Sequence, residues 1–225
     1  MNFNNEEQEH KKNKPIISIL QNYSKLKVFL ENNNDPNELL FQGITPIMLA
    51  VDEGTFKIIN LLLQFKADPN IMDDYKNNAI NYSYNIKDQN VIPLLSIFNT
   101  NINNKTIEGR TALIDATRMK NKNTVETLLN NNANTNIQDK SGWTALTYAS
   151  FHGYNDIVKI LLKKNTNINL KSKTGKTALN YAKDKKNKKI IRILNKYIII
   201  QGLKFANIYN LIPDELIKLI VIFIC

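Results

Sequence analysis

The hexapeptide TALTYA at residues 144–149 recurs along the chain at a spacing of 33 residues. The other copies are TPIMLA from Thr45, NAINYS from Asn78, TALIDA from Thr111 and TALNYA from Thr177. A fixed period of this size indicates one supersecondary unit copied end to end, in which each copy buries its apolar face against its neighbours. The sequence therefore predicts a solenoid, which has no single central core.

A weaker copy precedes these five, because Asp35-Pro36-Asn37 stands 33 residues before Asp68-Pro69-Asn70. We number the copies as units one to six, and count the turn before each hexapeptide with the unit that follows it. The pattern predicts three regions along the chain. They are a disordered polar leader over residues 1–11, a repeat array over 12–198 with units starting near 12, 45, 78, 111, 144 and 177, and a helical tail over 199–225.

The unit whose hexapeptide begins at Thr144 is predicted to form two short helices. Thr144 can cap the first helix by accepting a hydrogen bond from an unpaired backbone N–H, and Gly153 can end it. The second helix then carries Ile157, Val158 and Leu161 as a narrow apolar stripe at helical spacing. Each copy is therefore a helix, a tight turn and a second helix, and the predicted fold class is all-α.

Asparagine recurs at two positions after the second helix. The residue that ends this helix is expected to adopt a left-handed backbone, which Asn tolerates next best to Gly. The copies carry Asn33, Lys66, Asn99, Asn132 and Asn165 there. Four residues later every copy has asparagine, at Asn37, Asn70, Asn103, Asn136 and Asn169. For this second set we expect a side chain that bonds its own backbone within a turn.

Unit three departs most from the pattern. Asn78 replaces the threonine, Lys87 replaces the glycine, and Pro93 falls within the expected second helix. Proline is tolerated only in the first turn of a helix and costs about 3 kcal/mol or more deeper inside. Either the helix starts late or the array bends at this unit, and we favour a decayed copy over a hinge.

The composition narrows the class of protein. The formal net charge is +10, which suits an acidic protein partner, nucleic acid or an anionic surface. The single cysteine, Cys225, excludes an intrachain disulfide and favours a reducing compartment. The first residues lack the apolar segment of a secretory signal, and the apolar run at residues 219–225 is shorter than a membrane span. We expect a soluble, monomeric, cytoplasmic protein, or one acting in host cytoplasm if it comes from a virus or an intracellular bacterium.

The residues do not favour an enzyme. The two histidines, His10 and His152, stand far apart, and no glycine-rich phosphate loop, cysteine pair or nucleophile motif is present. We therefore expect no catalytic residue, no cofactor and no bound metal.

A helix, a tight turn, a second helix and a projecting turn at a period of 33 residues resemble the ankyrin repeat, whose signature begins T-P-L-H-x-A. The resemblance extends over residues 12–198. It rests on Thr45-Pro46, on the Thr-Ala-Leu triplets at 111, 144 and 177, and on Gly54 and Gly153. The chain departs from this signature at its fourth position, where histidine is replaced by Met48, Asn81, Ile114, Thr147 and Asn180.

The resemblance implies binding of a protein partner on one concave surface, formed by the projecting turns and the exposed ends of the first helices. The residues expected there are Tyr75, Ile107, Arg110, Arg118, Met119, Lys140, Trp143, Phe151, His152, Lys173, Lys176 and Lys185. Aromatic and arginine side chains are typical of interface hot spots, although Trp143 and Phe151 could instead pack between neighbouring units. The basic positions from 110 to 185 favour a partner with an acidic segment.

The 33-residue pattern stops after Ile198. The tail residues Ile212, Pro213, Glu215, Leu216, Leu219 and Ile220 resemble the opening of an F-box. Ankyrin arrays that end in a truncated F-box resemble the PRANC-type proteins of poxviruses and some intracellular bacteria, which implies recruitment of a cullin-type ubiquitin ligase. From the residues of the tail we rank a helix that caps the exposed end of the last repeat first, ligase recruitment second and membrane insertion third.

Taken together, the residues and the resemblance predict a non-catalytic array that binds a protein partner. The sharper form of this prediction is an adaptor that presents the bound partner to a ubiquitin ligase through the tail. One alternative is a scaffold or inhibitor whose tail only caps the solenoid. Another is a binder of nucleic acid or an anionic surface through the basic face, which we rank below a protein partner because no base-reading motif is present.

Overall fold

The computed structural model describes residues 18–164, 166–208 and 215, and it is helical with no strand in these ranges. The six second helices are α2 (Tyr23–Glu31), α4 (Phe56–Gln64), α5 (Val91–Ile97), α7 (Lys122–Asn130), α9 (Asn155–Leu162) and α11 (Lys188–Ile208). The first helices of units two to six are α3 (Pro46–Asp52), η2 (Ala79–Asn85), α6 (Ala112–Arg118), α8 (Ala145–His152) and α10 (Ala178–Asp184). A short 3₁₀ turn, η1 (Phe41–Gly43), lies in the turn of unit two.

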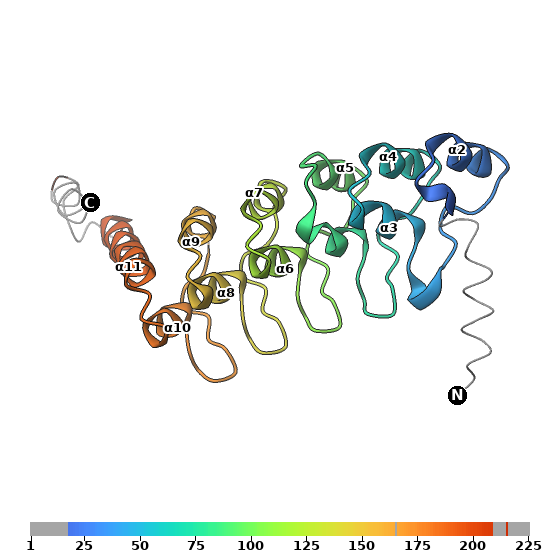
Figure 1. Ribbon diagram of the computed structural model, residues 1–225. Coiled ribbons are helices and arrows are strands. Elements are labelled where there is room, and N and C mark those ends of the chain that lie inside the picture. The colour runs from blue at the N-terminus through green and yellow to red at the C-terminus, as the bar shows by residue number, and fades with distance from the viewer. Residues whose placement is uncertain (1–17, 165, 209–214, 216–225) are drawn as a thin grey trace, which may run out of the picture.

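The helices form two rows along the array. Figure 1 shows the first helices beneath the second helices, with the projecting turns extending below both rows. Each first helix contacts its own second helix, and neighbouring units contact each other in both rows, as α6 does α8 and α7 does α9. The predicted all-α solenoid is confirmed.

One continuous apolar cluster runs through the stack. The second helices contribute large side chains such as Leu62, Leu128 and Leu161, which are fully or almost fully buried. The first helices contribute small residues such as Ala116 and Ala149, also fully buried, because neighbouring first helices approach closely there. Burial of this apolar surface between units is the main stabilising term of the array.

The projecting turns are joined by a ladder of backbone hydrogen bonds, one between each pair of turns. The amide of Asp74 donates to Gln42 O at 3.0 Å and that of Ile107 to Tyr75 O at 2.7 Å. The next two bonds, Lys140 N to Glu108 O and Lys173 N to Ser141 O, are both 3.0 Å. Each turn is thereby held by its neighbour, and the turns together form one continuous edge.

Gly142 of this ladder is required by close approach as well as by backbone conformation, whereas Gly175 is required by backbone conformation alone. Gly142 has φ of +77°, and a Cβ there would lie 2.9 Å from Lys173 N and from Ser172 Cα of the next turn. Gly175 has φ of +74°, but a Cβ there would meet nothing within 4 Å, because its turn is the last of the ladder.

The recurring asparagines behave in two ways. The expected left-handed backbone is confirmed at Asn33, Lys66, Asn99 and Asn132, whose φ angles are 60°, 66°, 55° and 67°. The prediction for the second set is wrong. Asn70 Oδ1 accepts from Asn101 N at 2.8 Å and Asn103 Oδ1 accepts from Asn134 N at 2.8 Å, so these side chains bridge to the following unit. The bond within the turn belongs to the residue two positions earlier, as when Asp68 Oδ1 accepts from Asn70 N.

Unit three is irregular but packed. Its first helix, η2, is a 3₁₀ helix, and its second helix, α5, begins at Val91. Pro93 therefore lies in the first helical turn, where its missing N–H has no intrahelical partner to lose. The late start of the helix, one of the two predicted outcomes, is the one observed.

The residues that replace histidine at the fourth position still support the start of the first helix in four units. Backbone amides of Thr45, Asn78 and Thr177 donate to Met48 Sδ, Asn81 Oδ1 and Asn180 Oδ1, respectively. The hydroxyls of Thr144 and Thr147 are 3.1 Å apart. Unit four has only the threonine cap, in which Thr111 Oγ1 accepts from Ile114 N at 3.4 Å.

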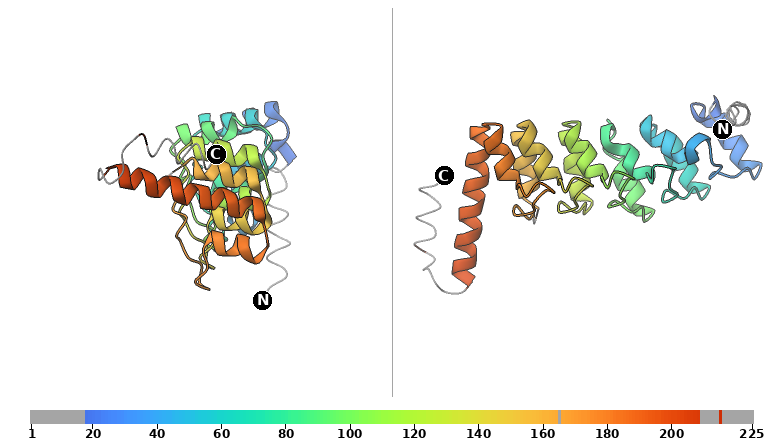
Figure 2. Two further views of the ribbon diagram at one scale, coloured as in Figure 1. Left: turned by 90° about the vertical axis from the view of Figure 1, so that its left-hand side faces the viewer. Right: turned by 90° about the horizontal axis from the view of Figure 1, so that it is seen from below.

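The last helix, α11, runs without interruption across the point at residues 198–199 where the repeat pattern stops. Its first part packs on the array through Ile190 and Leu194, which are buried. Figure 2 shows its later part extending past the side of the stack. Of the residues predicted for ligase recruitment, Glu215 is helical and exposed, and the others, Ile212, Pro213, Leu216, Leu219 and Ile220, lie outside the described residues, as does the leader.

Candidate partner-binding groove

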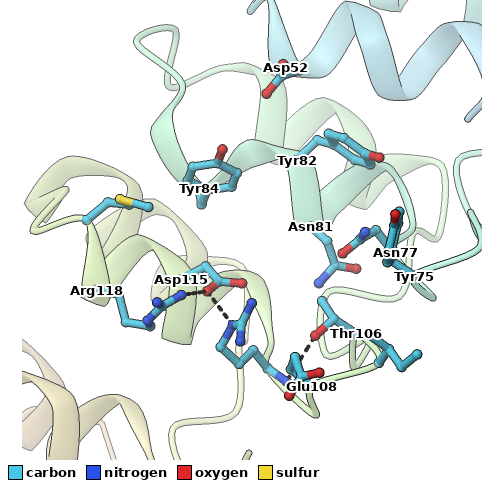
Figure 3. A pocket seen from close by; sticks show the side chains of 13 residues that line it. Asp52, Tyr75, Asn77, Asn81, Tyr82, Tyr84, Thr106, Glu108, Asp115 and Arg118 are labelled. Atoms are coloured by element: carbon cyan, nitrogen blue, oxygen red, sulfur yellow. Dashed lines mark hydrogen bonds and ion pairs between the residues drawn. The ribbon is translucent and has the colours of Figure 1, made fainter.

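A pocket of about 520 Å³ opens between units three and four, on the side of the projecting turns. Its walls come from the C-terminal end of α3, from η2, from α6 and from the turns that precede η2 and α6. Figure 3 shows Tyr75 and Asn77 on one turn, Thr106 and Glu108 on the next, and Asp115 and Arg118 on α6, with Asp52 across the opening. The pocket therefore lies on the surface for which partner binding was predicted.

The wall formed by unit three is fixed by a buried carboxylate. Asp73 Oδ1 accepts from the backbone amides of Tyr75 and Asn77, both at 2.8 Å, and Oδ2 accepts from the Tyr82 hydroxyl at 2.7 Å. Burial, and then the bond to the Asp73 carboxylate, raise the pKa of Tyr82 above its ordinary range. One side chain thus closes the projecting turn and ties it to the first helix.

Unit five repeats this arrangement. Asp139 Oδ1 accepts from the amides of Ser141 and Trp143, both at 2.8 Å, and Oδ2 accepts from the Tyr148 hydroxyl at 2.7 Å. Burial and the carboxylate raise the pKa of Tyr148 to about 12. The turn is again joined to its helix by one carboxylate and one phenol, and all three of these bonds lie within the unit.

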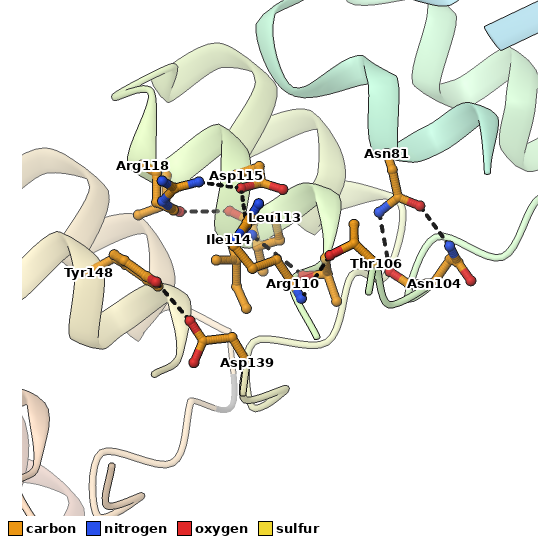
Figure 4. Close-up of polar contacts among 12 residues, drawn as sticks. Asn81, Asn104, Thr106, Arg110, Leu113, Ile114, Asp115, Arg118, Asp139 and Tyr148 are labelled. Carbon is orange, nitrogen blue, oxygen red and sulfur yellow. Dashed lines mark hydrogen bonds and ion pairs between the residues drawn. The ribbon is translucent and has the colours of Figure 1, made fainter. Parts of the chain in front are cut away.

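Unit four places different residues at these two positions. Thr106 stands where units three and five have aspartate. Its hydroxyl oxygen accepts one bond, from Arg110 N at 3.3 Å. Asp115 stands where they have tyrosine, and its Oδ1 accepts from Arg110 Nε and from Arg118 Nη1, both at 2.8 Å (Figure 4). The carboxylate of this unit therefore holds two guanidinium groups at the pocket wall. We call Arg110 and Arg118 the arginine pair.

Three large apolar side chains are exposed around the pocket. Tyr75 is 48% exposed, Ile107 43% and Met119 55%. They come from two successive projecting turns and from the end of α6, and all three line the pocket. Exposed apolar side chains that meet around one hollow are characteristic of a binding surface, whereas scattered ones are not.

The aromatic residues of unit five pack against unit six. The ring of Trp143 lies 4.8 Å from that of Tyr148, 5.1 Å from Phe151 and 4.6 Å from Tyr181 of the next unit. Packing between units, the alternative given for Trp143 and Phe151, is thus observed. Both remain partly exposed, and the Lys185 ammonium lies 4.2 Å from the centroid of Phe151, so the cluster also forms part of the surface.

The twelve predicted residues fall into two groups along the array. Tyr75, Ile107, Arg110, Arg118 and Met119 line the one pocket. The others lie on units five and six, where Lys140 and Lys173 are exposed at the turns, Lys176 pairs with Asp184 at 2.7 Å, and His152 is exposed and stacked on Tyr154. Three further residues that line the pocket, Asn81, Tyr84 and Asp115, were not predicted from the sequence. The sequence does show one sign of this site, because Asp115 stands where three other units have tyrosine.

Asn81 and Asn104 fix the floor between the two units. Asn104 Nδ2 donates to Asn81 Oδ1 and to Lys76 O, both at 2.7 Å, and Asn81 Nδ2 donates to Asn104 O at 3.3 Å. Both side chains are buried, and Figure 4 shows the hydrogen bonds between them. Because their polar groups satisfy each other, the pocket floor is held in place independently of any partner.

Among the residues that the structure describes, no group of three or more histidine, cysteine, aspartate or glutamate side chains could hold a metal ion. No described helix is both long and apolar enough to cross a membrane.

Comparisons with known proteins identify the repeats. A family model for three ankyrin repeats matches residues 82–172, and a model for a single ankyrin repeat matches residues 42–74. An ankyrin repeat protein of Acanthamoeba polyphaga mimivirus is 31% identical over 90 residues, which are 38% of this chain and 54% of that protein. This chain thus matches about half of that relative's length. The crystal structure of the ankyrin repeat protein EF0377 superposes with a TM-score of 0.74 and 26% identity, over 81% of this chain and 96% of that one.

Proposed function

Because the chain belongs to the ankyrin repeat family, whose repeats are generally non-catalytic modules for protein–protein interaction, we propose that it binds a protein partner on the side of the projecting turns. The bound surface extends from the pocket between units three and four to the basic turns of units five and six. The partner presents an acidic segment to this surface.

The pocket carries this proposal. Its rim gathers three exposed apolar side chains beside two arginines, and its walls are fixed by the Asp73 and Asn81 bonds. Apolar and arginine side chains around a preformed hollow are what interface hot spots require, because little ordering is needed on binding.

The test is capture of partners from eukaryotic cytosol by the full chain, followed by mass spectrometry. Met119→Glu places a charge at the pocket rim, and Ile97→Glu is the matched control on α5, where Ile97 is 75% exposed on the opposite row. We expect the specific partner to be lost with Met119→Glu and retained with Ile97→Glu. Retention by both variants would contradict binding at this surface.

A second role concerns the tail. The likeness of residues 212–220 to an F-box opening supports recruitment of a ubiquitin ligase, which would make the chain an adaptor. Full-length Leu216→Asp is expected to lose ligase subunits from the captured material and to keep the partner of the groove. If Leu216→Asp changes no captured protein but lowers the unfolding midpoint, the tail is a solenoid cap.

Binding of nucleic acid or an anionic surface through the basic face is the third proposal, supported by the net charge of +10. Such binding falls steeply with salt, whereas an apolar contact does not. A partner retained at high salt therefore favours the protein interface.

A further inference from the structure

We infer that the pocket between units three and four is a subsite for a peptide segment that inserts a large apolar side chain beside Met119 and sets a carboxylate on the arginine pair. This inference rests on the proposed function, since it names the chemistry of the partner that the groove receives.

The apolar part of this recognition follows from the size and rim of the pocket. A volume of about 520 Å³ lies within the roughly 300–1,000 Å³ typical of ligand sites, so one large side chain and its backbone can enter. Ile107 and Met119 lose their exposed apolar surface when such a side chain is bound, and this loss of apolar contact with water supplies the affinity.

The acidic part follows from an imbalance at Asp115. One carboxylate oxygen receives Nε–H of Arg110 and Nη1–H of Arg118, and the Asp115 side chain is only 14% exposed. Each guanidinium carries five N–H donors, so most donors of the pair are left over, and the cluster keeps one net positive charge. The side chains of Arg110 and Arg118 are 29% and 36% exposed, which leaves them reachable by a partner carboxylate in a bidentate contact.

Other charges at the pocket set the direction of the bound segment. Asp52 on α3 and Glu108 on the turn also line the pocket, and neither has an ion pair among the described residues. A partner carboxylate is repelled from these two and attracted to the arginine pair. The acidic end of the segment therefore lies at the arginine pair on the α6 side of the pocket, away from Asp52 across the opening.

The same charges disfavour a nucleic acid in this pocket. A nucleic acid strand carries a negative charge at each phosphate, and would bring phosphates against Asp52 and Glu108 as well as onto the arginine pair. A protein segment can place its carboxylate on one side only.

The experiment is selection from a displayed library of random peptides against the full chain, with Ile97→Glu as the control for surface charge. We expect enriched peptides to share a large apolar residue followed or preceded closely by Asp or Glu. A synthetic peptide of the enriched sequence is expected to bind Arg110→Gln and Arg118→Gln about tenfold more weakly or worse, the loss of about 1.4 kcal/mol. Met119→Glu is expected to abolish binding, and circular dichroism verifies that each variant is folded.

The inference is overturned if the enriched peptides carry no acidic residue, or if the two arginine variants bind them as the wild type does. In that case the proposed function still stands if the partner captured from cytosol is lost with Met119→Glu. If no peptide is enriched and capture is also insensitive to Met119→Glu, both fail. The site would instead be assigned to nucleic acid by one further result. In that result a single-stranded oligonucleotide displaces the peptide from the wild type at physiological salt but does not displace it from the arginine variants.

Discussion

Units four and five share a backbone but use their carboxylate differently. Both begin with a threonine cap, Thr111 and Thr144, and both have a turn closed by a left-handed glycine. In unit five the carboxylate is Asp139, in the turn, and all its bonds stay within the unit. In unit four it is Asp115, on the helix, and it holds the arginine pair at the pocket. A repeat can therefore give up an internal bond and gain a surface group without changing its fold.

The largest expected effect tests whether the backbones of the two units are equivalent. Gly142→Ala combines a left-handed backbone with a Cβ 2.9 Å from the next turn, so we expect it to lower the free energy of unfolding by about 3 kcal/mol. Gly109→Ala, with its nearest atom at 3.1 Å, should lose slightly less. Gly175→Ala is the control, and about 1 kcal/mol is expected because only the backbone term applies. Equal losses at 142 and 175 in urea unfolding would refute the role of the neighbouring turn.

The next effect separates the chemistry of the two units. Asp139→Ala removes an acceptor of two backbone amides and a phenol, and should lower the free energy of unfolding by about 2–3 kcal/mol. Thr106→Ala, the equivalent change in unit four, removes one 3.3 Å bond and should cost under about 1 kcal/mol. Urea unfolding of the two variants, followed by circular dichroism, gives the difference; similar losses would mean that unit four is held as unit five is.

A smaller effect concerns the asparagine bridge that both units share. Asn103→Ala removes the bond to Asn134 N and should lower the free energy of unfolding by about 1 kcal/mol. Asn169 stands at the same position of the last unit, where no further turn follows, so Asn169→Ala is the matched control and should change little. A loss at Asn169 as large as that at Asn103 would argue against a bridging role.

The smallest expected effect is a dependence of the free energy of unfolding on pH. Unit five has it through Tyr148, and unit four, which has Asp115 at that position, lacks it. The pKa of Tyr148 is raised from an ordinary value near 10 to about 12. Between these values the unfolded chain loses this proton and the folded chain keeps it, so the stability from Tyr148 is complete below about pH 10 and declines toward pH 12. Tyr148→Phe should therefore lose less stability than the wild type over this window. Tyr23→Phe, at an exposed tyrosine on α2, is the control, and identical slopes for all three proteins would contradict the assignment.

The sequence was sufficient for the repeat and for the left-handed backbone at the end of the second helices. The 33-residue period and the Asn and Lys residues after the second helix depend on local conformation, and local conformation is what a repeating pattern records. The role of Asn103 was predicted wrongly because its partner, Asn134 N, is 31 residues away and its distance could not be read from the pattern. The late start of α5 was one of two outcomes left open at Pro93.

The candidate site was only partly predictable, for a related reason. Exposure at each register could be predicted from the repeat, so Ile107, Arg110 and Met119 were selected, and the structure brings them to one pocket. Asp115 was missed because its register holds a half-buried or buried tyrosine in three other units. Its importance depends on two arginines on either side of it, and that geometry needs the helix and the turn to be placed together.

The most direct measurement gives unit four the chemistry of unit five. The double variant Thr106→Asp and Asp115→Tyr should restore the bond between turn and helix and release the arginine pair from its carboxylate. We predict an unfolding free energy equal to or above that of the wild type, together with at least about a tenfold loss of affinity for the selected acidic peptide. Unchanged affinity in a folded double variant would contradict the conclusion that the departure of unit four from the repeat builds the binding site.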